Sequence, residues 1–309
     1  MYVTLMKDEQ IYAETQHELP YTIKEKEEAE LLELTEDQFC IYAKGERFAY
    51  TFSKHYGAFI SMVVDGEEQF AERMKLSVFK APTDNERKMK MFWGNFNVWQ
   101  GENLDSTFSK IYDCYIEDGK IIVSGSLAGV SRVPVFRYTL VIDILKDGSV
   151  KINLNGKVRE EAIWLPRLGF ELELPGKTNA FTYYGHGPME SYCDMHHHAP
   201  IGLYESTAEN EYVNYVRPQE HGNHYGVKML KIGKLCVRSE EGMECNVSEY
   251  STEALNQAEH TDELVKDGKT HVRLDYKVSG IGSASCGTTL EEKYRLKDKE
   301  IAFALKICI

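Results

Sequence analysis

Two glutamates lie in loop-like segments framed by glycine and proline, where a carboxylate could serve as a general acid or base. Glu190 follows a Gly-Pro-Met sequence, and Glu220 stands between a proline and a glycine; His186 opens the first of these segments. An acid–base pair requires two titratable groups that face one substrate. The alternative is that each carboxylate orders its own loop by accepting backbone N–H bonds. We favour this alternative, because aromatic-rich turns need a local anchor, and we assign no catalytic residue.

Histidines gather in two short segments, 194–198 and 221–224. Adjacent side chains of an extended chain point to opposite faces, so His196 and His198 could share a metal ion while His197 could not. No Cys or His pair at zinc-finger spacing accompanies them, which favours a solvated loop. We therefore expect neither a metal nor a cofactor in this chain. The sequence also lacks a phosphate-binding loop and a Gly-Xaa-Ser-Xaa-Gly elbow, and 280–282 (Gly-Ile-Gly) is an isolated glycine pair.

Composition excludes several classes of partner. The formal net charge of −13 argues against nucleic acid, because phosphate binding requires neutralisation by Lys and Arg. The seven cysteines are scattered without a Cys-Xaa-Xaa-Cys pair, which is typical of free thiols in a reducing compartment. No apolar signal-peptide core and no run of 18 apolar residues occurs. These features predict a cytoplasmic protein that does not bind membranes.

The elements that must position these residues are predicted to be strands. Alternating apolar and polar residues, separated by turn residues every 8–12 positions, predict a β-sandwich rather than βαβ units. The expected hairpins pair 39–43 with 47–53, 58–64 with 69–70, 110–117 with 120–126, and 135–145 with 150–157. One helix is expected at 252–264, with Ser251 as its N-cap, and 92–108 is expected to be a long loop or short helix.

Three segments in colinear order carry a family resemblance: 79–86 (Phe-Lys-Ala-Pro-Thr-Asp-Asn-Glu), 165–169 (Leu-Pro-Arg-Leu-Gly) and 183–192 (Tyr-Tyr-Gly-His-Gly-Pro-Met-Glu-Ser-Tyr). With 212–223, 245–251 and 279–287 they resemble the C-terminal, small-chain domain of glycoside hydrolase family 2 β-galactosidases. The resemblance begins near residue 39 and continues to the end. It implies an all-β fold, a large antiparallel supersandwich of the galactose-mutarotase type with one or two short helices.

The resemblance also implies which residues approach the substrate. In the family, one loop after the Ala-Pro-Xaa-Asp-Asn motif and the Gly-Ile-Gly segment lie at the rim of the active site, so both should lie at one end of this sandwich. The implied rim residues are Asn85, Glu86, Trp93, Gly282, Ser285, Cys286 and Gly287. Cys286 stands where the best-known members place a tryptophan, and a thiol cannot stack on a sugar as an indole does. Structural roles are implied for Asp84, Arg167, Gly187 and Pro188.

The family's catalytic glutamates belong to a (β/α)8 barrel, and this sequence shows no strand–helix alternation. The resemblance therefore implies a non-catalytic part of a β-galactosidase, with the barrel portion or a large subunit as partner and a galactoside as substrate. Mg or Na ions would belong to the complete enzyme. Two alternatives remain: an aldose mutarotase that uses His186 and Glu220, or a carbohydrate-binding module that uses Trp93, Trp99 and Tyr184.

Two further expectations concern organisation. Residues 8–19 resemble the last strands of the small sandwich that precedes this domain in the family, so we expect 1–33 to be a remnant of that domain with a linker, and 34–309 the C-terminal domain. Arg167 is flanked by residues that look buried, and a buried guanidinium must be paired. We expect its partner to be Glu190 or Asp84.

Overall fold

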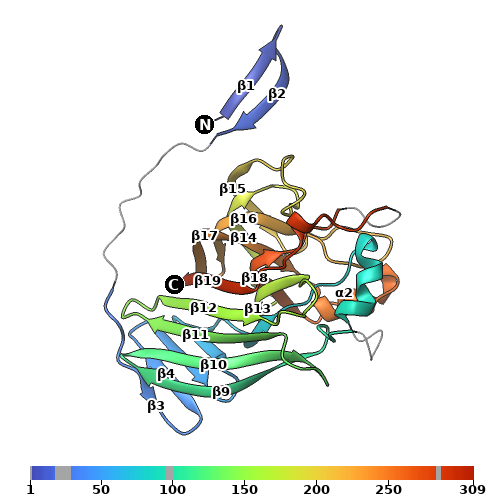
Figure 1. The fold of residues 1–309 in the computed structure, drawn as a ribbon. Coiled ribbons are helices and arrows are strands. Elements are labelled where there is room, and N and C mark those ends of the chain that lie inside the picture. The colour runs from blue at the N-terminus through green and yellow to red at the C-terminus, as the bar shows by residue number, and fades with distance from the viewer. Residues whose placement is uncertain (1, 18–28, 95–100, 283–286) are drawn as a thin grey trace.

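The computed structural model describes residues 2–17, 29–94, 101–282 and 287–309. Within this part of the chain the strands form three antiparallel sheets of two, five and twelve strands (Figure 1). The two-stranded sheet is an N-terminal hairpin of β1 (Tyr2–Lys7) and β2 (Gln10–Gln16). The five-stranded sheet contains β3 (Thr35–Glu36), β4 (Cys40–Lys44), β5 (Phe48–Ser53), β6 (Ala58–Val64) and β7 (Glu67–Glu68) in that order.

The twelve-stranded sheet runs in the order β15-β14-β16-β17-β19-β12-β11-β10-β9, and β18, β13 and β8 continue from β17 as a branch. Its first strands along the chain are β8 (Glu72–Ser77), β9 (Thr107–Glu117), β10 (Lys120–Gly129), β11 (Phe136–Ile144), β12 (Val150–Val158) and β13 (Arg167–Pro175). Its remaining strands are β14 (Ala180–His186), β15 (Ile201–Thr207), β16 (Asn223–Ile232), β17 (Leu235–Ser248), β18 (Lys269–Val278) and β19 (Glu300–Cys308).

Turn residues explain why the hairpins close where they do. Asp65 and Gly66 both have positive φ, at 49° and 78°, and so do Asp118 and Gly119, at 49° and 75°. Two successive positive φ values match the right-handed twist of the flanking strands, and Asp-Gly supplies them with little strain. The predicted hairpins are confirmed, with one correction. The strand that pairs with β6 is Glu67–Glu68 rather than residues 69–70, because the tight turn brings the residue directly after Gly66 into the ladder.

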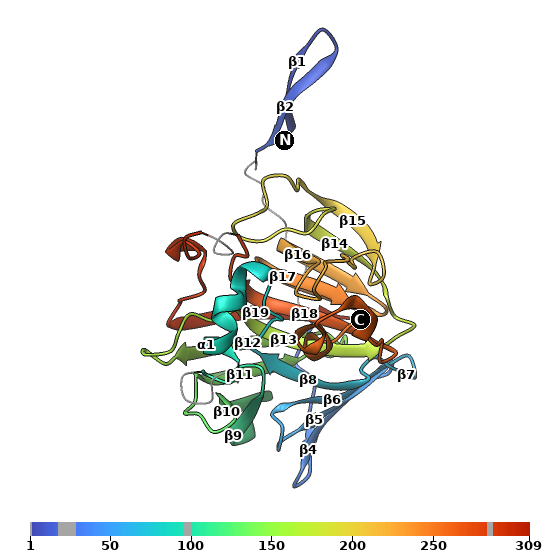
Figure 2. The same cartoon turned by 90° about the vertical axis from the view of Figure 1, so that its right-hand side faces the viewer.

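One core joins the two large sheets. Buried side chains of the five-stranded sheet, such as Phe52 and Phe59, belong to the same apolar cluster as Ile121 and Phe136 of the twelve-stranded sheet. Figure 2 shows β6 of the smaller sheet beside β8 of the large sheet, with β5 and β4 following β6. Burial of each such side chain contributes about 1.5–3 kcal/mol. The expectation of an all-β antiparallel sandwich is confirmed.

Helices are short and lie in the loops. The predicted helix at 252–264 begins as expected, because the hydroxyl of Ser251 accepts a bond from the Ala254 N–H at 3.1 Å. It ends early: α2 covers Thr252–Gln257, since Ala258 adopts an extended conformation, and a separate turn, η2, covers Thr261–Glu263. The 3-10 turn η1 (Asp84–Met89) and α1 (Lys90–Trp93) precede β9, and η3 (Glu292–Tyr294) precedes β19. No helix in the described ranges has both the length and the apolar character that crossing a membrane requires.

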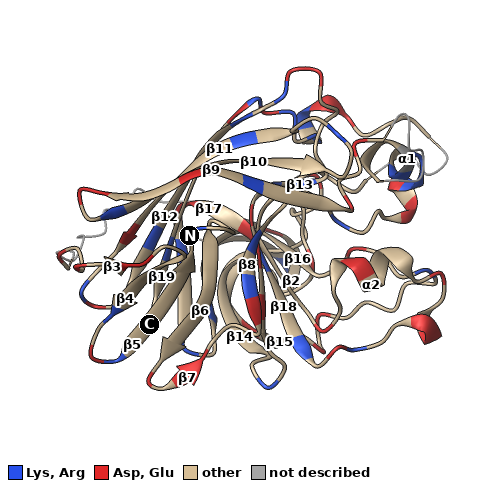
Figure 3. Ribbon diagram, turned by 90° about the horizontal axis from the view of Figure 1, so that it is seen from below, with Lys and Arg blue, Asp and Glu red and all other residues tan. Residues whose placement is uncertain are grey.

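The N-terminal hairpin stands apart from the core (Figures 1 and 2). It touches the edge strand β15 through the Gln16 amide, which accepts from the Ile201 N–H at 2.6 Å and donates to the Ile201 carbonyl at 2.7 Å. Its side chains from Tyr2 to Thr15 are exposed. The two predicted strands are confirmed, while their origin in a preceding domain remains a prediction. Acidic and basic residues are interspersed over the rest of the fold (Figure 3).

Candidate functional site

The sequence segments that carried the family resemblance meet at one place. Lys80, which is fully buried, lies 2.9 Å from a carboxylate oxygen of Glu86 and donates to the Ser279 carbonyl at 3.0 Å. Its ammonium also lies 5.9 Å from the centre of the Tyr192 ring. One lysine therefore connects residues 79–86, 183–192 and 279–282, which are far apart along the chain. These three segments come together only in the folded chain, since Lys80 and Ser279 are 199 residues apart in the sequence.

Arg167 forms the second connection. Its Nε donates to both carboxylate oxygens of Asp275, at 3.2 and 3.1 Å, its Nη2 contacts Asp275, and its Nη1 donates to Glu220 at 3.3 Å. All three side chains are buried. The predicted buried ion pair is confirmed, but the predicted partners were wrong. Asp275 is the cross-strand partner of Gly169 and meets the guanidinium from β18.

The two residues proposed as partners are occupied elsewhere. Asp84 is exposed and pairs with Arg87 at 2.7 Å, while its backbone N–H donates to the Gln219 side chain at 2.6 Å. Glu190 accepts from the Tyr215 hydroxyl at 2.7 Å and from the Gly222 N–H at 2.9 Å. Glu190 thus ties its own loop to the loop that carries Glu220.

The candidate acid–base residues are engaged by the protein. Burial raises the pKa of Glu220, but the charges of Arg167 and Arg273 outweigh this and leave its pKa below the usual value. The Nδ1–H group of His186 donates to the Ala199 carbonyl at 2.6 Å, and burial lowers the pKa of this imidazole. Contacts of this kind order loops and strands. His186 and Glu220 have separate partners, Ala199 and Arg167, so the structure does not support an acid–base couple of these two residues.

Glu244 is a buried acid that sequence reasoning missed. It accepts from the Val278 N–H at 2.8 Å and from the Asn223 amide at 2.7 Å. Burial raises its pKa to about 8, so the carboxyl is largely protonated at neutral pH. Glu244 lies in the long strand β17, opposite Asp275. No local signal separates it from the other acids of the chain, because its character depends on burial. Lys80, Arg167, Glu220, Glu244 and Asp275 are called the buried charge cluster below.

The Ser279 carbonyl, which accepts from Lys80, leads into a group of loop residues next to the buried charge cluster. We call this group the rim cluster: Asn85, Asp194 and residues 280–282. The Asn85 amide donates to the Ile281 carbonyl at 2.7 Å. The Asp194 carboxylate accepts from the Ile281 N–H at 3.2 Å and from the Gly282 N–H at 2.8 Å. For the described residues, the expectation that the two rim segments lie side by side is therefore confirmed. Ser285 and Cys286 lie outside the described residues, and Gly287 is exposed.

Two of the rim residues implied by the resemblance are buried instead. Glu86 accepts from the backbone N–H and the hydroxyl of Thr83, at 3.0 and 3.1 Å, at the start of η1. The Trp93 indole is fully buried, donates to the Trp164 carbonyl at 2.9 Å and packs edge-on against the Trp164 ring. Neither presents a side chain at the surface of this chain, so both assignments are corrected. An aromatic residue near a functional loop can bind a ligand or belong to the core, and the sequence does not distinguish these roles. Tertiary packing decides between them, and it buries Trp93.

Other assigned residues have clear positions. Gly187 and Pro188 are joined by a cis peptide bond, and the Gly187 N–H donates to the Pro200 carbonyl at 3.1 Å. Of the aromatics that a binding module would use, Tyr184 is exposed, Trp93 is buried and Trp99 lies outside the described residues.

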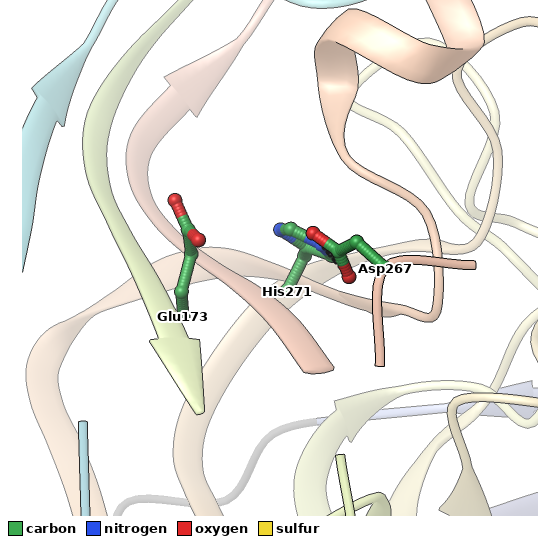
Figure 4. A group of neighbouring side chains, drawn as sticks. All are labelled: Glu173, Asp267 and His271. Atoms are coloured by element: carbon green, nitrogen blue, oxygen red, sulfur yellow. Dashed lines mark hydrogen bonds and ion pairs between the residues drawn. The ribbon is translucent and has the colours of Figure 1, made fainter. Parts of the chain in front are cut away.

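One group of metal-ligand type occurs in the described residues. Glu173, Asp267 and His271 offer ligand atoms within 4.8 Å of one another (Figure 4). Both oxygens of Glu173 are already paired, with Lys75 at 2.6 Å and Lys269 at 2.7 Å. A cation would have to displace two ammonium groups, so this donor set does not fit a metal ion. His196 and His198 instead bond to the carbonyls of Tyr192 and Glu190.

Known proteins resemble this chain over most of its length. The family described as "Beta galactosidase small chain" matches residues 44–307. A β-galactosidase of Actinobacillus pleuropneumoniae is 31% identical over 277 residues, covering 88% of this chain and 27% of that protein. One of Staphylococcus xylosus is 26% identical over 298 residues, covering 93% of this chain and 29% of that protein. The chain thus spans between a quarter and a third of these relatives.

Among solved structures, a galactose mutarotase-like protein from Lactobacillus casei has a TM-score of 0.48 at 10% identity, covering 87% of this chain and 99% of that one. The galactose 1-epimerase of Lactobacillus acidophilus has a TM-score of 0.41 at 9% identity, covering 100% of this chain and 97% of that one. These likenesses are too distant to carry an argument. Because the family match covers residues 44–307, however, this chain belongs to the β-galactosidase small-chain family.

Proposed function

We propose that this chain is the non-catalytic C-terminal domain or small subunit of a cytoplasmic β-galactosidase. Its partner would be the barrel portion of that enzyme or a large subunit that contains the barrel. The observation that carries the proposal is the family match over 44–307, together with relatives of which the chain spans only 27–29%. The remaining length of those relatives leaves room for a catalytic barrel. The six described cysteines are free thiols, which is compatible with a reducing compartment.

The rim cluster is the part that we propose to border the galactoside site. Its support is geometric: Asn85, Asp194 and Ile281 come from three loops that the buried charge cluster holds together. Loops positioned on a rigid sheet are the usual location of binding residues. Hydrolysis of a glycosidic bond needs two carboxylates placed on either side of it. In this chain Glu190 accepts hydrogen bonds from neighbouring loops, and Glu220 forms an ion pair with Arg167. We therefore propose that the catalytic pair, and any Mg or Na ion, belongs to the partner.

A reassembly experiment tests this proposal. The chain alone, the barrel-containing portion alone and the two together are assayed with a chromogenic β-galactoside. The expected result is no turnover by the chain alone and a strong gain when the two are combined. Turnover by the isolated chain that disappears in Glu190→Gln or Glu220→Gln would contradict the proposal, and so would a mixture no more active than the barrel portion alone.

The mutarotase alternative has a direct test as well. Polarimetry of freshly dissolved α-galactose measures mutarotation by the isolated chain. We expect the spontaneous rate, because Glu220 is ion-paired to Arg167 and His186 is bonded to a backbone carbonyl. Acceleration that is lost in His186→Ala would favour the mutarotase activity instead.

A further inference from the structure

Residues 279–282 lead into the proposed rim, and each of their four backbone N–H groups donates a hydrogen bond to another part of the fold. The Ser279 N–H donates to the Pro166 carbonyl and the Gly280 N–H to the Tyr294 carbonyl, both at 2.9 Å. The next two N–H groups, of Ile281 and Gly282, donate to the Asp194 carboxylate. Asp194 is thus the last anchor of the segment within the described residues. Hydrogen bonds to an ionised carboxylate are shorter and stronger than neutral ones.

The glycines on either side of Ile281 are explained by the same carboxylate. A Cβ placed on Gly280 would lie 2.5 Å from Cγ of Asp194, and one placed on Gly282 would lie 2.9 Å from its Oδ2. Real Cβ atoms do not approach so closely, so any side chain there would push Asp194 away. The Gly-Ile-Gly pattern, an isolated glycine pair in the sequence, therefore makes room for a carboxylate.

The opposite side of Ile281 is held by the loop that begins η1. The Asn85 amide donates to the Ile281 carbonyl, while the Ile281 N–H donates to Asp194. Ile281 is therefore hydrogen-bonded to two different loops, one with Asn85 and one with Asp194. Removing Asp194 would release the Ile281 and Gly282 N–H groups together and leave only Asn85 in place. The position of Gly282 then depends on one side chain.

We propose that Asp194 is the positioning residue of the rim cluster and, by holding residues 280–282 in place, sets the affinity of the site for its galactoside. This inference rests on the proposed function. Asp194 acts through residues 280–282 and is assigned no contact with the galactosyl group. Its loss should therefore change binding of a disaccharide and leave the chemistry on an activated aryl galactoside almost unchanged.

The first test uses the 309-residue chain alone, so it does not depend on the proposed function. Hydrogen exchange followed by mass spectrometry compares wild type with Asp194→Ala and Asp194→Asn. Peptides containing 281–282 should exchange about tenfold faster in Asp194→Ala, because protection reports local opening. Asp194→Asn, which keeps one acceptor, should be intermediate. The matched control is Asp113→Asn, an exposed acid on β9 remote in sequence from the rim, which should leave these peptides unchanged. Unchanged exchange in Asp194→Ala would overturn the proposal.

The glycines provide a second, independent test. Gly280→Ala should reproduce the faster exchange by displacing Asp194, whereas Gly287→Ala should not, because a Cβ there meets nothing within 4 Å. Two changes that act through one contact are not additive. The double variant Asp194→Ala with Gly280→Ala should therefore exchange no faster than Asp194→Ala. Additive acceleration would show that Gly280 acts by another route and would contradict the stated role of Asp194.

The third test uses the reassembled enzyme. In Asp194→Ala the KM for a disaccharide galactoside should rise by about tenfold to a hundredfold, because misplacing a positioned group by about 1 Å can cost about a hundredfold, while kcat for an aryl galactoside should stay within about twofold. An equal fall of kcat for both substrates, or no change in KM, would overturn the specificity role. If wild-type chain restores no activity at all, the proposed function fails and the specificity role fails with it, whereas the exchange tests still decide whether Asp194 positions the segment.

Discussion

The two ends of the β13–β18 ladder carry charge clusters of opposite character. At the end where Arg167 pairs with Val278 in register, Arg167, Asp275 and Glu220 are excluded from solvent. At the other end Glu173 faces His271, and its two lysine partners keep 39% and 29% of their side-chain surface exposed. The same pair of strands therefore holds one dry and one wet cluster about six residues apart.

The difference shows which charges the fold depends on. A charge excluded from water loses its hydration and must be compensated by the protein, so removing one partner leaves the other uncompensated. Where lysines stay partly hydrated, water takes over the role of a lost partner and salt screens what remains. The dry cluster should then support the junction of the motif segments, and the wet cluster should contribute little.

Arg167→Ala should give the largest effect. Loss of the guanidinium leaves Asp275 and Glu220 buried without the cation that they pair with directly, which costs about 3–5 kcal/mol of unfolding free energy. Urea unfolding followed by tryptophan fluorescence measures it. The matched control is Arg47→Ala, whose exposed pair with Asp65 at 2.7 Å should contribute less than about 1 kcal/mol. Equal losses in the two variants would remove the distinction between dry and wet clusters.

Glu244→Gln should change how stability depends on pH. The folded-state pKa of Glu244 is raised to about 8 from an ordinary value of 4.5, so between these pH values the folded chain keeps a proton that the unfolded chain releases. Stability should therefore fall as pH rises, by up to about 1.4 kcal/mol per pH unit, and level off above pH 8. Glutamine cannot ionise and should remove this part of the slope.

The measurement for Glu244 is urea unfolding at pH 5, 6.5 and 8 in both proteins. The stability of wild type minus that of Glu244→Gln should be most favourable at pH 5 and least favourable at pH 8. A difference that is constant across the three pH values would mean that Glu244 is ionised in the folded chain. That result would contradict the raised pKa of the buried Glu244 carboxyl.

Glu173→Gln should give the smallest effect, about 1 kcal/mol or less, because Lys75 and Lys269 remain hydrated after the change. The effect should also shrink in high salt, since these ion pairs border solvent. Unfolding in low and in about 1 M salt, where screening acts within about 3 Å, measures both quantities. A loss as large as that of Arg167→Ala, unaffected by salt, would show that this end of the ladder is dry too.

Much of the fold could be predicted because its signals are local. The Asp-Gly turns at 65–66 and 118–119 and the Ser251 cap depend on residues within a few positions of one another, and each was found as expected. The length of α2 was not predictable from its own sequence, since Ala258 is buried by tertiary packing and leaves the helix there. The expected approach of residues 85–93 to residues 282–287 agrees, within the described residues, with the bond from Asn85 to Ile281, beside Gly282. The role of these segments at an active-site rim remains a prediction.

By itself, the sequence determined the strand pattern, its turns and its family, because alternation, turn chemistry and colinear motifs are properties of neighbouring residues. Only the tertiary structure decided the partners. Asp275 reaches Arg167 across a separation of 108 residues, and Asp194 reaches Gly282 across 88. Strand register and loop packing choose such contacts, and with 49 acids in the chain no local rule singles out the right one. Trp93 illustrates the same limit, since an indole is a binding platform or a core residue according to what covers it.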